Sequence, residues 1–178
     1  MLPQISSLYK LPLTHPTLCL VQGAAFGGAL GLIACCDIAV ATSNAKFCLS
    51  EVKLGLIPAV ISPYVIKAIG ERQARRYFLT AEVFMAEKAL DMGLVHEIND
   101  DLAAAQDQFV ELLLNNGPAA VKSAKSLINE VANQDIDSEL ILHTAKRIAE
   151  IRVSEEGQEG LSAFFDKRAP IWQTAAKQ

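Results

Sequence analysis

The stretch 23-GAAFGGALGLIACCD-37 is almost wholly apolar and yet carries four glycines. Glycine is among the poorest residues for the interior of a helix or strand, so such a segment either bends sharply or lets another group approach its backbone closely. Thr17–Val21 before it is a β-type run, Ala24–Gly28 is typical of a turn, and Ala29–Cys36 suits a short helix that is apolar on every side. The stretch therefore predicts a strand, a glycine-rich turn and a buried helix.

The first half of the chain alternates between strands and helices. Further strands are expected at Asp37–Ala41, Ala45–Ser50 and Leu94–Ile98, and helices at Ala59–Ile69 (interrupted by Pro63), Glu71–Thr80 and Ala86–Met92, with Gly93 as a C-cap. This alternation predicts an α/β layer with parallel strands. Because three or four short strands are few for a complete sheet, we expect the sheet to begin upstream of this sequence.

The second half reads as helix throughout. Helices are expected at Leu102–Leu114, Ala119–Val131, Asp137–Val153 and Glu155–Lys167. Pro118 is well placed at a helix start, and Ser154 can cap the last of these helices. Leu161, Phe164 and Phe165 fall on one face of that helix, so we expect them to be buried against the chain's own core or a neighbouring subunit.

Composition limits the class of protein. The 178 residues suit one domain, or one domain with a helical appendage, and 51% apolar with 20% charged residues argues against disorder. The net charge of −4 argues against nucleic acid as a main partner. A small phosphorylated ligand stays open, because a few local cations would suffice to bind it.

The cysteines and the N-terminus indicate a cytoplasmic protein. Residues 1–10 lack a basic region followed by an apolar run, so no secretory signal is expected. None of the four cysteines is in C-x-x-C spacing, and we interpret them as small buried residues in a reducing compartment, with no metal site: Cys19, Cys35, Cys36 and Cys48.

A membrane helix is the alternative for Leu11–Cys36, which contains no Asp, Glu, Lys or Arg. Its glycines have the G-x-x-x-G spacing of packed membrane helices. Against a membrane span stand the interior polar and helix-breaking residues and the lack of a basic flank: Pro12, His15, Pro16, Gln22 and the Gly27-Gly28 pair. We therefore expect no membrane association.

Gly27 and Gly28 are the first candidate site. A helix that begins there points backbone N–H groups and its positive dipole end at whatever lies before it, and the missing Cβ atoms permit close approach. This suits an oxyanion hole for a carbonyl that gains negative charge. A tight strand-to-helix packing turn explains the same pattern equally well.

Glu51 is the second candidate. In FCLSEV, Phe47, Leu49 and Glu51 share a face if the strand continues that far, so the carboxyl group would point inward. A carboxyl group held in an apolar pocket can exchange protons near neutral pH. For a lone glutamate, an exposed side chain paired with Lys53 is the more usual outcome.

Three motifs in the right order resemble the crotonase superfamily, the enoyl-CoA hydratases and isomerases. They are VQGAAFGGALGLIACCDIAVATSNAKFCLSEVKLGLIP, TAEVFMAEKALDMGLVHEI and EGLSAFFDKRAPIW, which together span essentially the whole chain. LSEVKLGLIPAVISPYV and AIGERQARRYFLTAE look most like bacterial hydratases of branched, carboxylated enoyl-CoAs, such as the methylglutaconyl-CoA type.

The resemblance implies an α/β fold in which residues 1–117 form a partial ββα spiral core, with its N-terminal turns missing. It also implies that residues 118–178 form helices that assemble a homotrimer, often a dimer of trimers. Two backbone N–H groups would bind the thioester oxygen. One falls on Gly28, and the other is expected from an N-terminal loop outside this sequence.

The resemblance makes Glu51 one of the family's two proton-handling glutamates. The other falls on Gly31, which has no side chain, and the glycine-rich turn after Ile-Pro is here AVIS, residues 59–62. Catalytic roles are therefore expected for Glu51 and Gly28, and substrate binding for Phe26, Gly27, Gly31, Pro58 and Ala59.

The implied reaction is hydration of a 2-enoyl-CoA, with an acyl-CoA thioester as the substrate and without a metal or other cofactor. The alternatives are a 3-enoyl/2-enoyl-CoA isomerase, for which one glutamate suffices, and a truncated subunit without catalytic activity.

Overall fold

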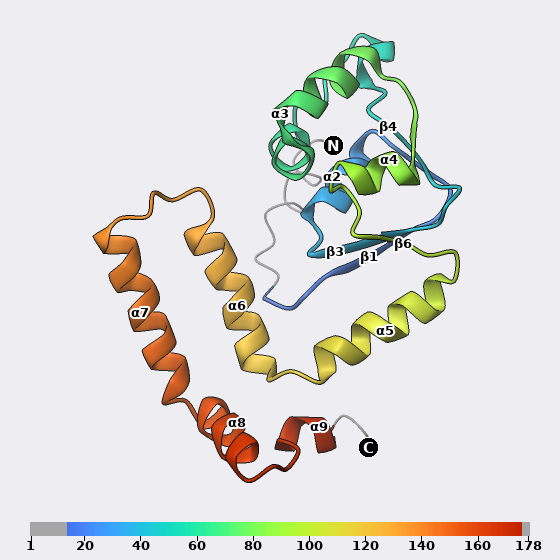
Figure 1. Cartoon of the computed structure of the whole chain (residues 1–178). Helices are drawn as coiled ribbons and strands as arrows, with labels where there is room; N and C mark the ends of the chain where they lie inside the picture. The colour runs from blue at the N-terminus through green and yellow to red at the C-terminus, as the bar shows by residue number, and fades with distance from the viewer. Residues whose placement is uncertain (1–13, 176–178) are drawn as a thin grey trace, which may run out of the picture. The chain divides into compact units, whose positions relative to one another are not determined.

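The computed structural model describes residues 14–175, which form two compact units. The first unit comprises residues 17–107, and the second joins residues 14–16 to residues 108–175. Figure 1 shows the strands of the first unit in blue to green and the helices of the second in yellow to red. Each unit is described by itself below.

The first unit contains two small sheets built by a repeating path of the chain. Its strands are β1 (Leu18–Val21), β2 (Ala24–Phe26), β3 (Ile38–Ala41), β4 (Lys46–Cys48), β5 (Phe84–Met85) and β6 (Glu97–Ile98). One sheet has the order β1-β3-β6 and the other the order β2-β4-β5. Each pass of the chain thus adds one strand to each sheet. All pairs are parallel except β4 with β5, which confirms the predicted α/β layer of parallel strands.

Helices follow the strand pairs. Helix α2 (Gly28–Cys35) follows β2, and the 3₁₀ helix η1 (Glu51–Leu54) and helix α3 (Ser62–Thr80) follow β4. Helix α4 (Ala86–Asp91) lies between β5 and β6. Burial is most complete in β3, where Ala39, Val40 and Ala41 are all buried, whereas Ala24 and Phe26 of β2 are exposed.

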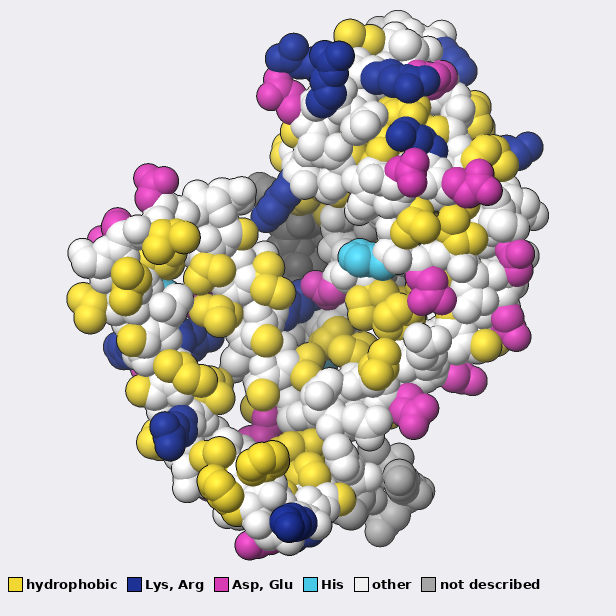
Figure 2. Space-filling model, viewed as in Figure 1, with side chains coloured by type: hydrophobic (Ala, Val, Ile, Leu, Met, Phe, Trp, Pro, Cys, Tyr) yellow, Lys and Arg dark blue, Asp and Glu magenta, His cyan; other side chains and the backbone are white. Residues whose placement is uncertain are grey.

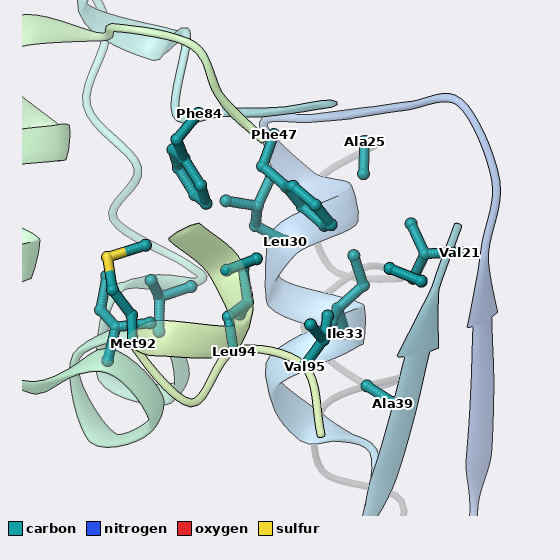
Figure 3. Packing of buried hydrophobic residues seen from close by; sticks show 14 of the residues in the cluster. Val21, Ala25, Leu30, Ile33, Ala39, Phe47, Phe84, Met92, Leu94 and Val95 are labelled. Carbon is teal, nitrogen blue, oxygen red and sulfur yellow. The ribbon is translucent and has the colours of Figure 1, made fainter. Parts of the chain in front are cut away.

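The core of the first unit forms around α2. Leu30 and Phe47 have no exposed surface, and Ile33 is almost completely buried. Figure 3 shows Leu30 and Ile33 on α2 among apolar side chains from the strands and from the segment after α4. The Phe84 ring adds aromatic packing, with its centroid 5.5 Å from that of Phe47 and 4.5 Å from that of Tyr77. This apolar helix thus buries Leu30, Gly31 and Ile33 in the core and leaves Leu32 exposed.

Three sequence predictions about the strands need correction. Ala24–Gly28 is not a turn: the turn comes earlier, at Gly23 with φ +74°, and residues 24–26 form β2, paired with residues 46–48. The strand predicted over Ala45–Ser50 ends at Cys48. Of Leu94–Ile98, only the last two residues pair with β3, because the N–H groups of Leu94 and Val95 donate to the Ala89 carbonyl oxygen and close α4.

Pro63 begins a helix where the sequence suggested an interruption. It lies in the first turn of α3, where a missing N–H costs nothing. The predicted break at residue 70 is confirmed, because Gly70 has φ +77° and ψ 156° and separates two helical halves.

The later helices lie close to their predicted positions. They are α5 (Leu102–Leu114), α6 (Pro118–Val131), α7 (Ser138–Arg152), α8 (Glu155–Phe165) and α9 (Ile171–Ala175). Ser154 caps α8 as predicted, since its hydroxyl accepts from Gly157 N–H at 3.1 Å. Within residues 14–175, every helix is too short or too polar to cross a bilayer.

The α8 face predicted to be buried against the chain's own core or a neighbouring subunit is not covered by the described residues of the chain itself. Phe164 and Phe165 are 76% and 75% exposed, and Leu161 is also exposed. A neighbouring side of α8 makes intrachain contacts: Ala163 is buried, and Gly160 lies against the Trp172 ring. Apolar side chains are spread over the visible surfaces of these helices (Figure 2). A neighbouring subunit remains as the predicted cover for this face.

Leu30→Ala tests whether α2 anchors the core. Removing this fully buried side chain leaves a cavity, so we expect the free energy of unfolding to fall by about 2–5 kcal/mol. Leu32→Ala is the matched control, because Leu32 lies on the same helix with 47% of its surface exposed. Urea denaturation followed by circular dichroism measures both. Equal losses in the two variants would show that α2 does not pack as described.

Candidate active site

Gly27 links the end of β2 to the start of α2 and the end of β4. Its N–H donates to the Cys48 carbonyl oxygen at 2.9 Å, and it is the N-cap residue of α2 with φ +56° and ψ −123°. This backbone conformation is readily available only to glycine. The chain can therefore leave one sheet and enter the helix within a single residue.

The Glu51 carboxyl group lies directly beside Gly27. A Cβ atom built on Gly27 would be 3.4 Å from Glu51 Oε1 and 3.9 Å from Ser50 Oγ. Glu51 reaches this place because β4 ends at Cys48 and the chain then turns into η1, of which Glu51 is the first residue. The structure thus brings together two residues that the sequence analysis treated as separate candidates.

One oxygen of this carboxyl group has no hydrogen-bond partner. Glu51 Oε2 is buried, and no donor within residues 14–175 reaches it. Leaving a buried polar atom unpaired costs free energy, so such an atom in a folded protein calls for a functional explanation. The exposed ion pair with Lys53, the alternative from the sequence, is not formed among the described residues.

The face shared by Phe47, Leu49 and Glu51 was predicted on the assumption of a continuous strand. The strand ends earlier, but Phe47 and Leu49 are buried and Glu51 is half-buried. The inward direction of the carboxyl group therefore comes from the turn into η1 and not from strand alternation.

Gly28 is the first residue of α2 and is exposed. Apart from its chain neighbours and its own helix backbone, no heavy atom of the described residues lies within 4 Å of the position that a Cβ atom would take on it. The first turn of α2 carries no acidic side chain and no side-chain cap, so the partial positive charge of the helix N-terminus is not offset there by a carboxylate of the helix itself. An oxygen that gains negative charge can be stabilised at this end.

The other predicted substrate-binding residues differ in exposure. Phe26 and Ala59 are exposed, whereas Gly31 and Pro58 are buried. Phe26 precedes the Gly27-Gly28 pair directly. Pro58 and Ala59 follow η1 in the chain, and only this position in the sequence brings them near the Glu51 carboxyl group.

Sequence analysis missed an apolar surface that follows η1. Leu54, Leu56 and Ile57 are 75%, 60% and 74% exposed, which is unusual for three large apolar residues so close in the chain. The signal was available in the run 54-LGLIP-58, which continues directly from Glu51. These side chains give the segment after Glu51 an exposed apolar area.

Two of the described histidines, His96 and His143, have hydrogen-bond partners elsewhere in the chain. His96 Nδ1 accepts from Ala39 N–H at 3.0 Å, and His143 Nε2 lies 2.8 Å from Glu130 Oε2. Among the described residues, no group of three or more His, Cys, Asp or Glu side chains has the arrangement to hold a metal ion.

Comparisons with known proteins point to one family. A family model described as enoyl-CoA hydratase/isomerase matches residues 2–175. A crystal structure of an enoyl-CoA hydratase from Shewanella pealeana is 57% identical with a TM-score of 0.92, over 95% of this chain and 64% of that one. Pseudomonas aeruginosa AtuE is 36% identical with a TM-score of 0.89, over 95% of this chain and 67% of that one.

Among curated proteins, enoyl-CoA hydratase AKT6-1 of Alternaria alternata is 36% identical over 89% of this chain and 54% of its own length. The chain therefore spans between about half and two thirds of the length of these relatives.

Gly27→Ala tests the backbone constraint at the site. Alanine is strained at this φ and ψ, so we expect the free energy of unfolding to fall by about 1–3 kcal/mol. Gly28→Ala is the matched control, because its Cβ atom meets open space and its φ is not positive. We expect this change to be neutral or to stabilise by up to about 1 kcal/mol. Thermal unfolding measures both, and a neutral Gly27→Ala would contradict the conformation described.

Proposed function

Because the chain belongs to the enoyl-CoA hydratase/isomerase family, we propose that it hydrates a 2-enoyl-CoA at the surface formed by Gly27, Gly28 and Glu51. The observation that carries the proposal is the Glu51 carboxyl group, whose Oε2 is buried without a hydrogen-bond partner among the described residues and whose Oε1 lies beside Gly27, the N-cap residue of α2. A carboxylate held next to an oxyanion-stabilising helix end is the arrangement that proton transfer to and from an activated thioester requires.

The proposed reaction begins with the thioester carbonyl oxygen at the N-terminus of α2, where Gly28 N–H donates to it. Electron density withdrawn into this oxygen makes the β-carbon of the enoyl group electrophilic. Glu51 accepts a proton from a water molecule while the oxygen of that water bonds to the β-carbon. Glu51 then delivers a proton to the α-carbon. The sum is the addition of water across a double bond, so no electrons are exchanged with a redox cofactor.

A second donor to the thioester oxygen is also proposed, from a segment outside this sequence, since one N–H group forms only half of the family's oxyanion hole. The buried Gly31 stands where the resemblance places a second glutamate, so Glu51 is the proposed proton carrier for both steps. Phe26, Pro58 and Ala59 remain proposed substrate contacts.

The missing second carboxylate favours a second candidate function, the 3-enoyl/2-enoyl-CoA isomerase. One carboxylate can move a single proton between the α-carbon and the γ-carbon, whereas activating water is easier with two. The third alternative is a subunit without catalytic activity.

The acyl group is proposed to be branched, such as methylglutaconyl. The support is the resemblance of the segments around Glu51 and α3, together with the exposed Leu54, Leu56 and Ile57, which offer apolar contact area.

Assembly as a homotrimer, or a dimer of trimers, is proposed for the helices after Pro118. The support is the exposed face of α8 formed by Leu161, Phe164 and Phe165, in which the two aromatic rings pack edge to face with centroids 5.7 Å apart. A surface of this kind is typical of a protein–protein contact.

Glu51→Gln tests the proposed proton transfer. The substitution keeps the size of the side chain but removes its basicity, so we expect turnover to fall by about a hundred- to ten-thousand-fold with little change in substrate binding. Hydration is followed by the loss of the ultraviolet absorbance of the conjugated enoyl thioester, over a panel of straight and branched substrates. A parallel assay with 3-enoyl-CoAs separates the hydratase from the isomerase.

Glu87→Gln is the control for that experiment, because Glu87 is an exposed carboxylate on α4. A Glu51→Gln variant that keeps more than about a tenth of the wild-type rate would contradict the proposed role. A wild-type chain that binds CoA thioesters without converting any of them would support the inactive subunit.

Phe164→Glu tests the proposed assembly. We expect light scattering at micromolar concentration to give the mass of a trimer or its multiple for the wild type and a smaller species for the variant, because a charge on this face must be desolvated on association. A monomeric wild type would argue against the trimer.

A further inference from the structure

Ser50 stands between the end of β4 and the candidate carboxylate, Glu51. It is the N-cap residue of η1, and a serine at an N-cap ordinarily accepts a hydrogen bond from a backbone N–H two or three residues later. Ser50 does not, because its backbone, with φ −85° and ψ 0°, is helical rather than extended as such a cap requires. Its hydroxyl has no hydrogen-bond partner among the described residues, so it is available to a bound molecule.

The Ser50 hydroxyl and the Glu51 carboxyl group lie on the same side of Gly27. The position that a Cβ atom would take on Gly27 is 3.4 Å from Glu51 Oε1 and 3.9 Å from Ser50 Oγ. Apart from the chain neighbours of Gly27, the three described heavy atoms nearest to that position all belong to these two side chains. Because glycine places no side chain there, the two oxygens border a space that a small molecule can enter.

Addition of water to a double bond needs the attacking water to be held in one orientation. The water must give up a proton and direct a lone pair at the β-carbon, and fixing that geometry contributes much of the rate. The resemblance assigns two glutamates to the proton chemistry, but residue 31 is a buried glycine. A single carboxylate leaves the second O–H of the water without an acceptor.

We propose that Ser50 is a further catalytic residue, which orients the attacking water together with Glu51. This inference rests on the proposed hydration. The water donates one O–H to the Glu51 carboxylate and the other to Ser50 Oγ, so that a lone pair faces the β-carbon. Glu51 takes the first proton as the C–O bond forms, the electrons of the double bond move towards the thioester oxygen, and the α-carbon then receives the proton from Glu51. Ser50 keeps its own proton throughout, so the sum is still the addition of one water.

The separation of the two oxygens is compatible with a shared water molecule. Since each O–H···O hydrogen bond is about 2.8 Å long, one water can bridge oxygens up to about 5.5 Å apart. Two oxygens that lie 3.4 and 3.9 Å from one point can meet that limit. The inference separates two reactions: hydration needs the oriented water, whereas removal of an α-proton from a saturated acyl-CoA needs only Glu51 and the helix end that stabilises the oxyanion.

The test compares Ser50→Ala with the wild-type chain in both reactions. Hydration of crotonyl-CoA and 3-methylglutaconyl-CoA is followed by ultraviolet absorbance, and exchange of the α-protons of butyryl-CoA in D₂O by mass spectrometry. We expect Ser50→Ala to lower kcat for hydration by about ten- to a hundred-fold with little change in KM, and to leave proton exchange at the wild-type rate. Ser50→Thr, which keeps a hydroxyl, should retain most of the hydration rate, and Glu51→Gln should lose both reactions.

Ser43→Ala is the matched control, because Ser43 is an exposed serine of the same unit whose hydroxyl donates to Asp100 Oδ2 at 3.0 Å. It should keep the wild-type rate in both assays. Thermal unfolding of each variant separates loss of the oriented water from loss of the fold. Ser50→Ala should melt at the wild-type temperature, since its hydroxyl holds no other described residue in place.

Three results for Ser50→Ala would overturn the role of this serine and leave the proposed hydratase standing. They are hydration at the wild-type rate, equal losses of hydration and exchange, and a melting temperature well below that of the wild type. A Ser50→Thr variant as slow as Ser50→Ala would do the same. A wild type that hydrates neither enoyl-CoA would instead overturn the proposed hydration, and this inference with it.

Discussion

The hydrogen bond from Gly27 N–H to the Cys48 carbonyl oxygen is the interaction on which the candidate site depends. It joins the start of α2 to the end of β4, so the two segments that leave the second sheet begin side by side. The positive φ of Gly27 then turns the chain into the helix, and the turn after Cys48 brings Glu51 against the same residue. A carboxylate and a helix N-terminus meet because two strand ends meet.

The same constraint explains why a glycine-rich segment can be buried. Gly23 and Gly27 both have positive φ and provide the bends at the two ends of β2. Between and after these bends, the small and apolar residues of β2 and α2 fill the space among the strands, as Leu30 and Ile33 show in Figure 3. The glycine-specific backbone conformations of this segment are confined to Gly23 and Gly27.

The helical unit is held together by tight polar contacts at its corners and leaves its apolar faces open. Glu156 accepts from the N–H groups of Ala119 and Ala120 and so caps α6 from α8. Gly157 permits the close turn between α7 and α8, since a Cβ atom there would overlap the Ile151 carbonyl oxygen. Helices fixed in this way by caps and glycines can present Phe164 and Phe165 outward without losing their arrangement.

Most of the secondary structure could be predicted from the sequence, because it depends on local signals. The apolar runs marked the strands, Ser154 marked a helix start, and the glycine pair with Glu51 marked the candidate chemistry. The resemblance to a family added roles for these residues. None of these signals requires knowledge of what lies across the chain.

The tertiary structure alone decided which segments pair. Ala24–Phe26 became a strand because residues 46–48 were there to pair with it, against the turn that its small residues suggested. The end of β4 at Cys48 turned Glu51 towards Gly27 and left one carboxylate oxygen buried without a partner. Strand pairing and burial depend on groups far apart in the sequence, whereas helix caps, turns and apolar periodicity depend on neighbours, so only the latter can be read from the chain itself.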